Sequence, residues 1–143
     1  MPRPISRRDY EALAEVRYQI RRFLNFSEAA ARTAGVEPQQ HQLLLTVKGL
    51  PAGEAPTIRA CAERLQIQHH SAVELVNRAE QQGLVLREPS ATDRRAVTLT
   101  VTPRGEVSLR ELTLAHRSEL RAAAPSLVRA LTAILPDAAE EQP

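Results

Sequence analysis

The segment LQIQHHSAVELVNRAEQQGLV, residues 65–85, decides the expected fold. It predicts a helix over residues 68–82, because its apolar residues recur at spacings of three and four. Gly83 favours a left-handed C-cap after this helix. A shorter helix with the same periodicity precedes it, begins after a capping Thr57 and buries Ile58, Cys61, Ala62 and Leu65. Two such helices joined by a short turn are typical of a helix-turn-helix.

Two short strands are expected after this pair of helices. Residues 84–86 form an apolar run, and residues 97–102 alternate apolar side chains with threonines, which is typical of a strand with one buried face. The connection over residues 88–95 is polar and carries Arg94 and Arg95. A helix-turn-helix followed by a hairpin with a basic tip predicts a winged helix.

Long amphipathic helices flank this unit. Residues 7–34 carry one apolar stripe, with Ser6 as the expected N-cap and Gly35 as the end. A second helix over Pro38 to Gly49 completes the winged part, and Pro103 opens a later helical region that Pro125 is expected to break or kink. The predicted fold is mostly α with a small β-hairpin wing (α+β). The winged helix-turn-helix lobe spans 38–102, dimerisation helices span 7–34 and 103–136, and residues 137–143 form a disordered tail.

Composition excludes several classes of protein. The chain has 143 residues, one cysteine, 3% aromatic residues and a formal net charge of +2. A disulfide framework, a cysteine-based zinc ribbon and a base-stacking module are therefore excluded. The sequence lacks a Gly-rich phosphate loop, a Gly-x-Ser-x-Gly elbow and paired carboxylates, so no enzyme is predicted. Without a signal peptide or a run of apolar residues that would span a bilayer, the protein is expected in the cytoplasm.

The exposed side of the helix over residues 68–82 is the predicted DNA-reading surface. Its amino end is rich in side chains that donate or accept hydrogen bonds, as base edges in the major groove require. Asn77 lies further along the same face. The residues expected in the major groove are Gln68, His69, His70, Ser71, Val73 and Glu74. Flanking arginines suit phosphate contacts, which set register without reading sequence: Arg59, Arg64, Arg78, Arg87 and Arg94.

The chain resembles the multiple-antibiotic-resistance regulator (MarR) family of winged-helix repressors. The resemblance rests on PQQH at residues 38–41, on residues 65–85, and on DRRAVTLTVTPRG at residues 93–105. It implies that Arg95 enters the minor groove, that Asp93 orients the wing and that Arg94 contacts the backbone. It also implies a homodimeric repressor on a pseudo-palindromic operator in double-stranded DNA. Dimerisation is assigned to Leu13, Ile20, Leu127, Leu131 and Ile134.

The resemblance also implies that a small aromatic or anionic ligand releases the repressor from DNA. The position of each segment in the sequence suggests the residues that line the ligand pocket: Arg17, Phe23, Phe26, His41 and His116. No cofactor and no bound metal are predicted, although a metal-responsive branch using His41 and His116, a redox-responsive branch and a protein–protein adaptor stay as alternatives. The only thiol, Cys61, is expected on a buried helix face, unlike the first-helix cysteine of the redox branch.

Overall fold

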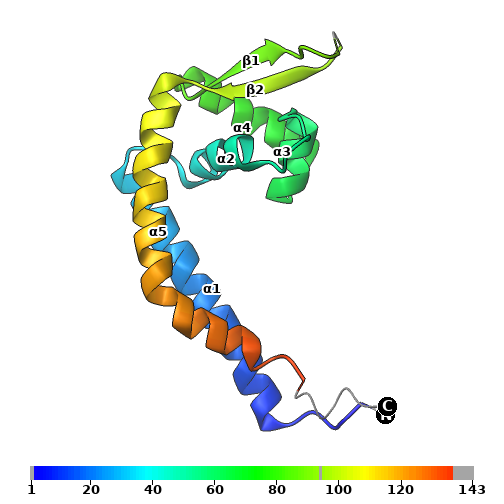
Figure 1. Cartoon of the computed structure of the whole chain (residues 1–143), viewed down its shortest axis with the longest axis vertical. Coiled ribbons are helices and arrows are strands. Elements are labelled where there is room, and N and C mark those ends of the chain that lie inside the picture. The colour runs from blue at the N-terminus through cyan, green and yellow to red at the C-terminus, as the bar shows by residue number, and fades with distance from the viewer. Residues whose placement is uncertain (1, 94, 137–143) are drawn as a thin grey trace. The chain divides into compact units, whose positions relative to one another are not determined.

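The computed structural model describes residues 2–93 and 95–136. They fall into two compact units, each described here by itself: a helical unit (Met1–Ala29 with Ala115–Pro143) and a winged lobe (Ala30–Leu114). The elements, in chain order, are α1 (Arg7–Thr33), α2 (Pro38–Gly49), α3 (Ile58–Leu65), α4 (His69–Gln81), β1 (Val85–Pro89), β2 (Val97–Val101) and α5 (Pro103–Thr132). This is the predicted mostly α architecture with a two-stranded wing (Figure 1).

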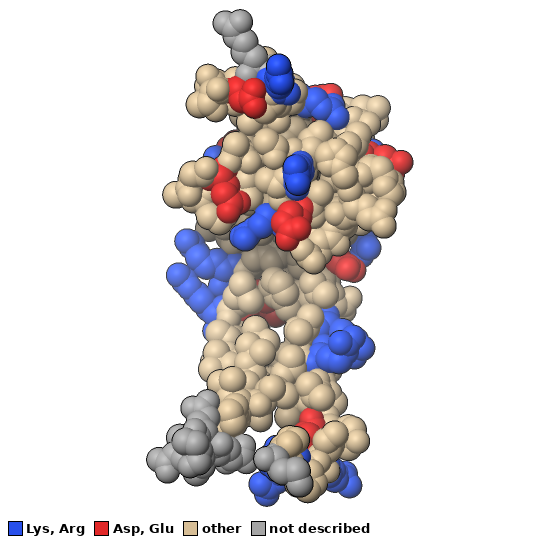
Figure 2. Space-filling view, turned by 90° about the vertical axis from the view of Figure 1, so that its right-hand side faces the viewer, with Lys and Arg blue, Asp and Glu red and all other residues tan. Residues whose placement is uncertain are grey.

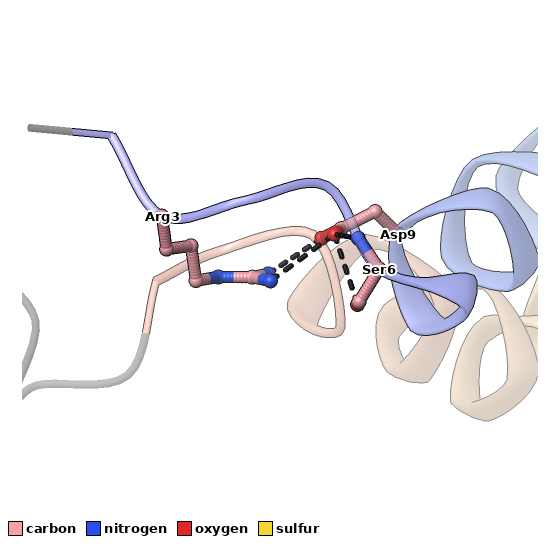
Figure 3. Close-up of polar contacts among 3 residues, drawn as sticks. All are labelled: Arg3, Ser6 and Asp9. Carbon is pink, nitrogen blue, oxygen red and sulfur yellow. Dashed lines mark hydrogen bonds and ion pairs between the residues drawn. The ribbon is translucent and has the colours of Figure 1, made fainter.

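The first turn of α1 is held by hydrogen bonds that the Asp9 carboxylate accepts (Figure 3). The Asp9 carboxylate accepts hydrogen bonds from the Ser6 backbone N–H at 2.6 Å and the Ser6 hydroxyl at 3.0 Å. Arg3 also donates to this carboxylate, at 3.1 Å through Nη1. The Ser6 amide, followed by Arg3, lowers the pKa of Asp9 to about 2. Ser6 directly precedes α1, as predicted, and the Asp9 carboxylate accepts the Ser6 N–H as the acidic residue of a capping box does.

The core of the winged lobe lies between its helices and the hairpin. Helices α2, α3 and α4 pack against one another, while β1 contacts α4 and β2 contacts α2 (Figure 1). The largest buried side chains are Leu43, Leu44, Leu99, Val76, Val85 and Cys61. Thr57 Oγ1 accepts the Ala60 N–H at 3.1 Å, which confirms the predicted start of α3. The lobe therefore has a continuous apolar core on which α4 is held.

The wing is an antiparallel hairpin. Val85 pairs with Val101 at its base and Pro89 pairs with Val97 at its outer end. The first strand therefore continues to Pro89, three residues beyond the predicted apolar run, because backbone pairing does not require apolar side chains. Leu99 N–H also donates to the Pro56 carbonyl at 2.8 Å, which fixes β2 to the loop before α3.

A compact junction joins α4, the wing and α5. Gly83 has φ +72°, as its predicted C-cap role requires. The Thr102 hydroxyl donates to the Gly83 carbonyl at 2.5 Å and accepts the Gly105 N–H at 3.0 Å. Thr102 N–H donates to the Leu84 carbonyl at 3.0 Å. One threonine thus caps α5 and holds both ends of the hairpin together.

Of the two outcomes expected at Pro125, a break or a kink, the break is wrong. A single helix, α5, continues through Pro125 to Thr132. Proline removes one backbone hydrogen bond and displaces the carbonyl four residues earlier. Strong helix formers, Ala122–Ala124, precede it, and the hydrogen bonds on either side keep the helix continuous. The predicted disordered tail over 137–143 lies outside the described residues.

Gly105 tests this junction. A Cβ at Gly105 would overlap the Leu84 carbonyl oxygen and lie 2.8 Å from Val101 Cγ1. We expect Gly105→Ala to lower the free energy of unfolding by roughly 2 to 3 kcal/mol, since backbone must move to admit the methyl group. Gly49→Ala is the matched control, because its Cβ meets nothing within 4 Å. Urea unfolding of both variants measures the effect, and equal stabilities would show that the junction is not closely packed.

Candidate nucleic-acid interface

Helix α4 separates a buried face from an exposed polar face. Ala72, Leu75, Val76 and Ala79 are buried in the winged lobe, as the periodicity predicted. The residues predicted to read bases lie on the other side: Gln68, His69, His70 and Glu74 are exposed, and Ser71 and Val73 are half-buried. Asn77 is exposed one turn beyond Val73. The helix thus presents a row of hydrogen-bonding side chains over its first three turns.

The amino end of α4 has open backbone donors. Gln68 is its N-cap in an extended conformation, and the Gln68 side chain makes no capping hydrogen bond. The first amides of a helix have no partner within the helix, and the helix dipole gives this end partial positive charge. This end is therefore suited to an anionic group such as a phosphate.

The wing tip is ordered by short-range hydrogen bonds. Asp93 Oδ1 accepts the Arg95 backbone N–H at 3.0 Å, and Ser90 Oγ accepts the Asp93 N–H at 3.3 Å. Ser90 N–H donates to the Ala96 carbonyl at 3.0 Å and closes the loop. These contacts hold the backbone on either side of the tip, where Arg95 is exposed. Arg94 lies outside the described residues.

The flanking arginines have different surroundings. Arg59 and Arg64 are exposed on α3, and neither makes an ion pair with another described residue. Arg78 is 3.7 Å from a Glu37 oxygen, a loose surface pair. Arg87 instead makes close contacts with Glu80 and Asn77. On the face drawn in Figure 2, basic and acidic side chains are interspersed.

Sequence reasoning missed the role of Glu80. This half-buried carboxylate on α4 accepts both the Arg87 N–H, at 3.3 Å, and Arg87 Nη1, at 2.8 Å. The contact joins α4 to β1 across seven positions of sequence. Nothing in the periodicity of α4 indicates it, because the partner is defined only once β1 returns beside the helix.

The helical unit brings together three of the residues predicted to line a pocket. The His116 ring on α5 lies edge-on to Phe23 and Phe26 of α1, with ring centroids 5.9 and 5.4 Å away. Its Nε2 is 2.7 Å from Ser27 Oγ. Arg17 is exposed on the same helix as the two phenylalanines. His41 is buried in the winged lobe.

Most of the predicted dimerisation residues are exposed apolar side chains. Leu13 is 55% exposed, Ile20 45%, Leu131 49% and Ile134 43%, whereas Leu127 is half-buried. Leu24, Val128 and Leu135 are exposed in the same unit. Several large apolar side chains are therefore exposed in one unit, which is the kind of surface that a protein–protein interaction covers.

Cys61 is chemically protected. It is fully buried in the core of the winged lobe, and burial raises the pKa of its thiol to about 11. Because the thiolate is the reactive form, this cysteine is poorly suited to peroxide sensing. In the described parts of the chain, no cluster of three His, Cys, Asp or Glu side chains is arranged to hold a metal ion. Likewise, none of the helices in residues 2–93 and 95–136 is long and apolar enough to span a membrane.

Comparisons with known proteins agree on one family. A model described as the MarR family matches residues 34–96, which contain the helix-turn-helix and most of the wing. The chain is 33% identical over 93 residues to a putative transcriptional regulatory protein for the hcr operon from Thauera aromatica. The match covers 65% of this chain and 54% of the relative, so it spans about half of that protein's length.

Solved structures share the fold at low sequence identity. AbsC, a MarR family transcriptional regulator from Streptomyces coelicolor, matches with a TM-score of 0.71 at 18% identity over 85% of this chain and 82% of its own. A MepR mutant from S. aureus, solved bound to an oligodeoxyribonucleotide, matches with a TM-score of 0.58 at 17% identity. This match covers 93% of the present chain and 88% of the MepR chain. CouR from Rhodococcus jostii, solved bound to p-coumaroyl-CoA, matches with a TM-score of 0.59 at 21% identity. This match covers 68% of the present chain and 67% of the CouR chain.

Proposed function

We propose that the chain is a winged helix-turn-helix transcriptional regulator of the MarR family, whose model matches residues 34–96, and that it acts as a homodimeric repressor of transcription. It binds a pseudo-palindromic operator in double-stranded DNA in the cytoplasm, with one α4 in the major groove of each half-site. The single observation that carries the proposal is the exposed polar face of α4 in the same lobe as a basic wing ordered by Asp93.

The contacts divide between base reading and positioning. Gln68, His69, His70 and Ser71 begin α4, where a recognition helix meets base edges, and Val73 and Glu74 continue the same surface. Arg59, Arg64, Arg78, Arg87 and Arg94 supply phosphate contacts, aided by the open amides at the start of α4. The net charge of +2 gives only weak non-specific attraction, so affinity depends on where these groups lie.

The wing supplies a second point of contact. Asp93 accepts the Arg95 backbone N–H, and Arg95 is exposed beside the hairpin tip. A narrow minor groove has strongly negative potential and attracts an inserted arginine. Arg95 therefore reads groove width beside each half-site, while α4 reads base edges.

Arg95→Ala tests the role of the wing. We expect a loss of operator affinity of about 1–3 kcal/mol and a weaker preference for A·T pairs at the positions flanking each half-site. The operator is first obtained by selecting bound duplexes from a random pool, and affinities are then measured by gel shift at fixed salt. Arg21→Ala, which removes one exposed positive charge from α1, is the control. Equal affinity of Arg95→Ala and the control would rule out the minor-groove contact.

The exposed apolar side chains of the helical unit support a homodimer. Ile20 and Leu131 are about half exposed in the single chain. A second copy that covers them removes apolar surface from water, which stabilises the dimer by about 25 cal/mol for each Å² buried. Two linked half-sites also bind far more tightly than one.

Ile20→Glu is expected to dissociate the dimer and to reduce operator affinity steeply, because a charge is costly in an apolar interface. Light scattering measures the mass, and Asn25→Glu adds the same charge at another exposed position of α1. Leu131→Glu repeats the test from α5, and circular dichroism checks that each variant is folded. A folded Ile20→Glu or Leu131→Glu protein with dimeric mass would contradict this interface.

Release from the operator is assigned to a small aromatic or anionic ligand at Phe23, Phe26 and His116, with Arg17 on the same helix as the two phenylalanines. Two phenylalanine rings beside a histidine offer apolar contact and a polar contact to one ligand. Ligand binding would change the spacing of the two α4 helices, so both half-sites lose register together.

Four aromatic anions test this assignment. Benzoate, salicylate, p-coumarate and p-coumaroyl-CoA are added to the protein–operator complex. We expect at least one of them to weaken operator binding by about 5- to 150-fold. Phe26→Ala should reduce that response while leaving operator affinity without ligand unchanged. If none of the four compounds alters operator binding, or if Phe26→Ala responds like the wild type, this ligand class or this site is wrong.

A further inference from the structure

A three-residue network holds one side chain of the DNA-reading face in a single orientation. Arg87 on β1 donates through Nη1 to Glu80 Oε1 at 2.8 Å and through Nη2 to Asn77 Oδ1 at 2.6 Å. The Arg87 backbone N–H donates to Glu80 Oε2 at 3.3 Å. Arg87 therefore makes three donor contacts to two residues of α4.

The chemistry of the guanidinium decides how the Asn77 amide is turned. Arginine has five N–H donors and no acceptor, so the Asn77 atom beside it must be the oxygen. The amide is planar, and its NH₂ group then points away from Arg87. Asn77 is exposed, whereas Arg87 and Glu80 are each about one-third exposed at their side chains. The network therefore presents two outward N–H donors.

Glu80 is what keeps Arg87 in place. Its carboxylate accepts from both the backbone and the side chain of Arg87, and hydrogen bonds between charged groups are stronger than neutral ones. Because the guanidinium is planar, the hydrogen bond from Nη1 to Glu80 also fixes the position of Nη2, which donates to the Asn77 oxygen. A lysine at position 87 has one nitrogen and does not reproduce this fork.

Asn77 extends the surface already assigned to DNA. It lies four residues after Val73 and three after Glu74, so the three share one side of α4. An asparagine that is free to rotate reads adenine by using its oxygen and its nitrogen together, on N6 and N7. With its oxygen held by Arg87, Asn77 is not free to adopt that pairing.

We propose that Asn77 binds DNA as a donor-only side chain, oriented by Arg87, and that Arg87 is itself positioned by Glu80. Its ligand is an acceptor-only edge: guanine N7 and O6, thymine O4, or a phosphate oxygen. This inference rests on the proposed function, and it assigns Arg87 a positioning role in addition to any contact with phosphate.

Selection of duplexes from a random pool tests the proposal. Asn77→Asp keeps the shape of the side chain and its contact with Arg87 but replaces the two donors by an acceptor. We expect it to lose about tenfold in affinity for the duplex that the wild type selects. Gln81→Glu makes the same amide-to-acid change one turn further along α4 and should lose much less. Asn77→Ala distinguishes the two sources of acceptor.

If a base supplies the acceptor, Asn77→Ala relaxes the preference at one position of each half-site. If a phosphate does, affinity falls equally on all duplexes and the salt dependence is unchanged, since asparagine carries no charge. Arg87→Lys releases the Asn77 oxygen, so we expect it to weaken the same preference and to admit adenine at that position, and adding Arg87→Lys to Asn77→Ala should cause no further loss of affinity. Additive losses would overturn the positioning role of Arg87.

The failure of this inference differs from the failure of the proposed function. A wild-type protein that selects no duplex overturns both. A wild type that selects a motif, with Asn77→Asp and Asn77→Ala selecting the same motif at the affinity of Gln81→Glu, overturns only the role of Asn77. Thermal unfolding confirms that each variant is folded, and Asn77→Asp decides the question even if Arg87→Lys does not fold.

Discussion

The junction around Thr102 is the constraint on which the proposed interface depends. Thr102 bonds to the Gly83 carbonyl, to the Gly105 N–H and to the Leu84 carbonyl, so it meets the end of α4, the start of β1 and the start of α5. The absent side chain of Gly105 permits this approach. A wing and a helix that read two different grooves need a fixed separation, and this junction provides it within the lobe.

Two polar networks refine that arrangement at the surface. Asp93 orients the backbone of Arg95 at the wing tip, and Glu80 holds Arg87 against Asn77 on α4. Groups ordered before binding lose less conformational entropy when they meet a ligand. For a chain with a net charge of only +2, such preorganisation matters more than long-range electrostatic attraction.

Local sequence rules were sufficient for much of the fold. Thr57, Gly83 and Thr102 act as the caps that their residue types indicate, because a cap is decided within a few residues. The break expected at Pro125 is wrong for the opposite reason. The local cost of proline is overcome when the helix on both sides is otherwise favourable, and a single-residue rule does not weigh that.

The candidate site was less accessible to sequence reasoning. The exposed face of α4 follows from its period of 3.6 residues, so its polar residues were named correctly as a surface. The link between Glu80, Arg87 and Asn77 was not foreseen, because it joins residues seven and ten positions apart through the return of β1 beside α4.

Methylation footprinting of the selected duplex tests the central claim most directly, because dimethyl sulfate modifies guanine N7 in the major groove and adenine N3 in the minor groove. The account predicts two guanine-protected segments about one helical turn apart, each flanked by protected adenines. With Arg95→Ala, the adenine protection alone should disappear. Adenine protection that persists in Arg95→Ala, or guanines that react as in free DNA, would contradict the placement of α4 and the wing.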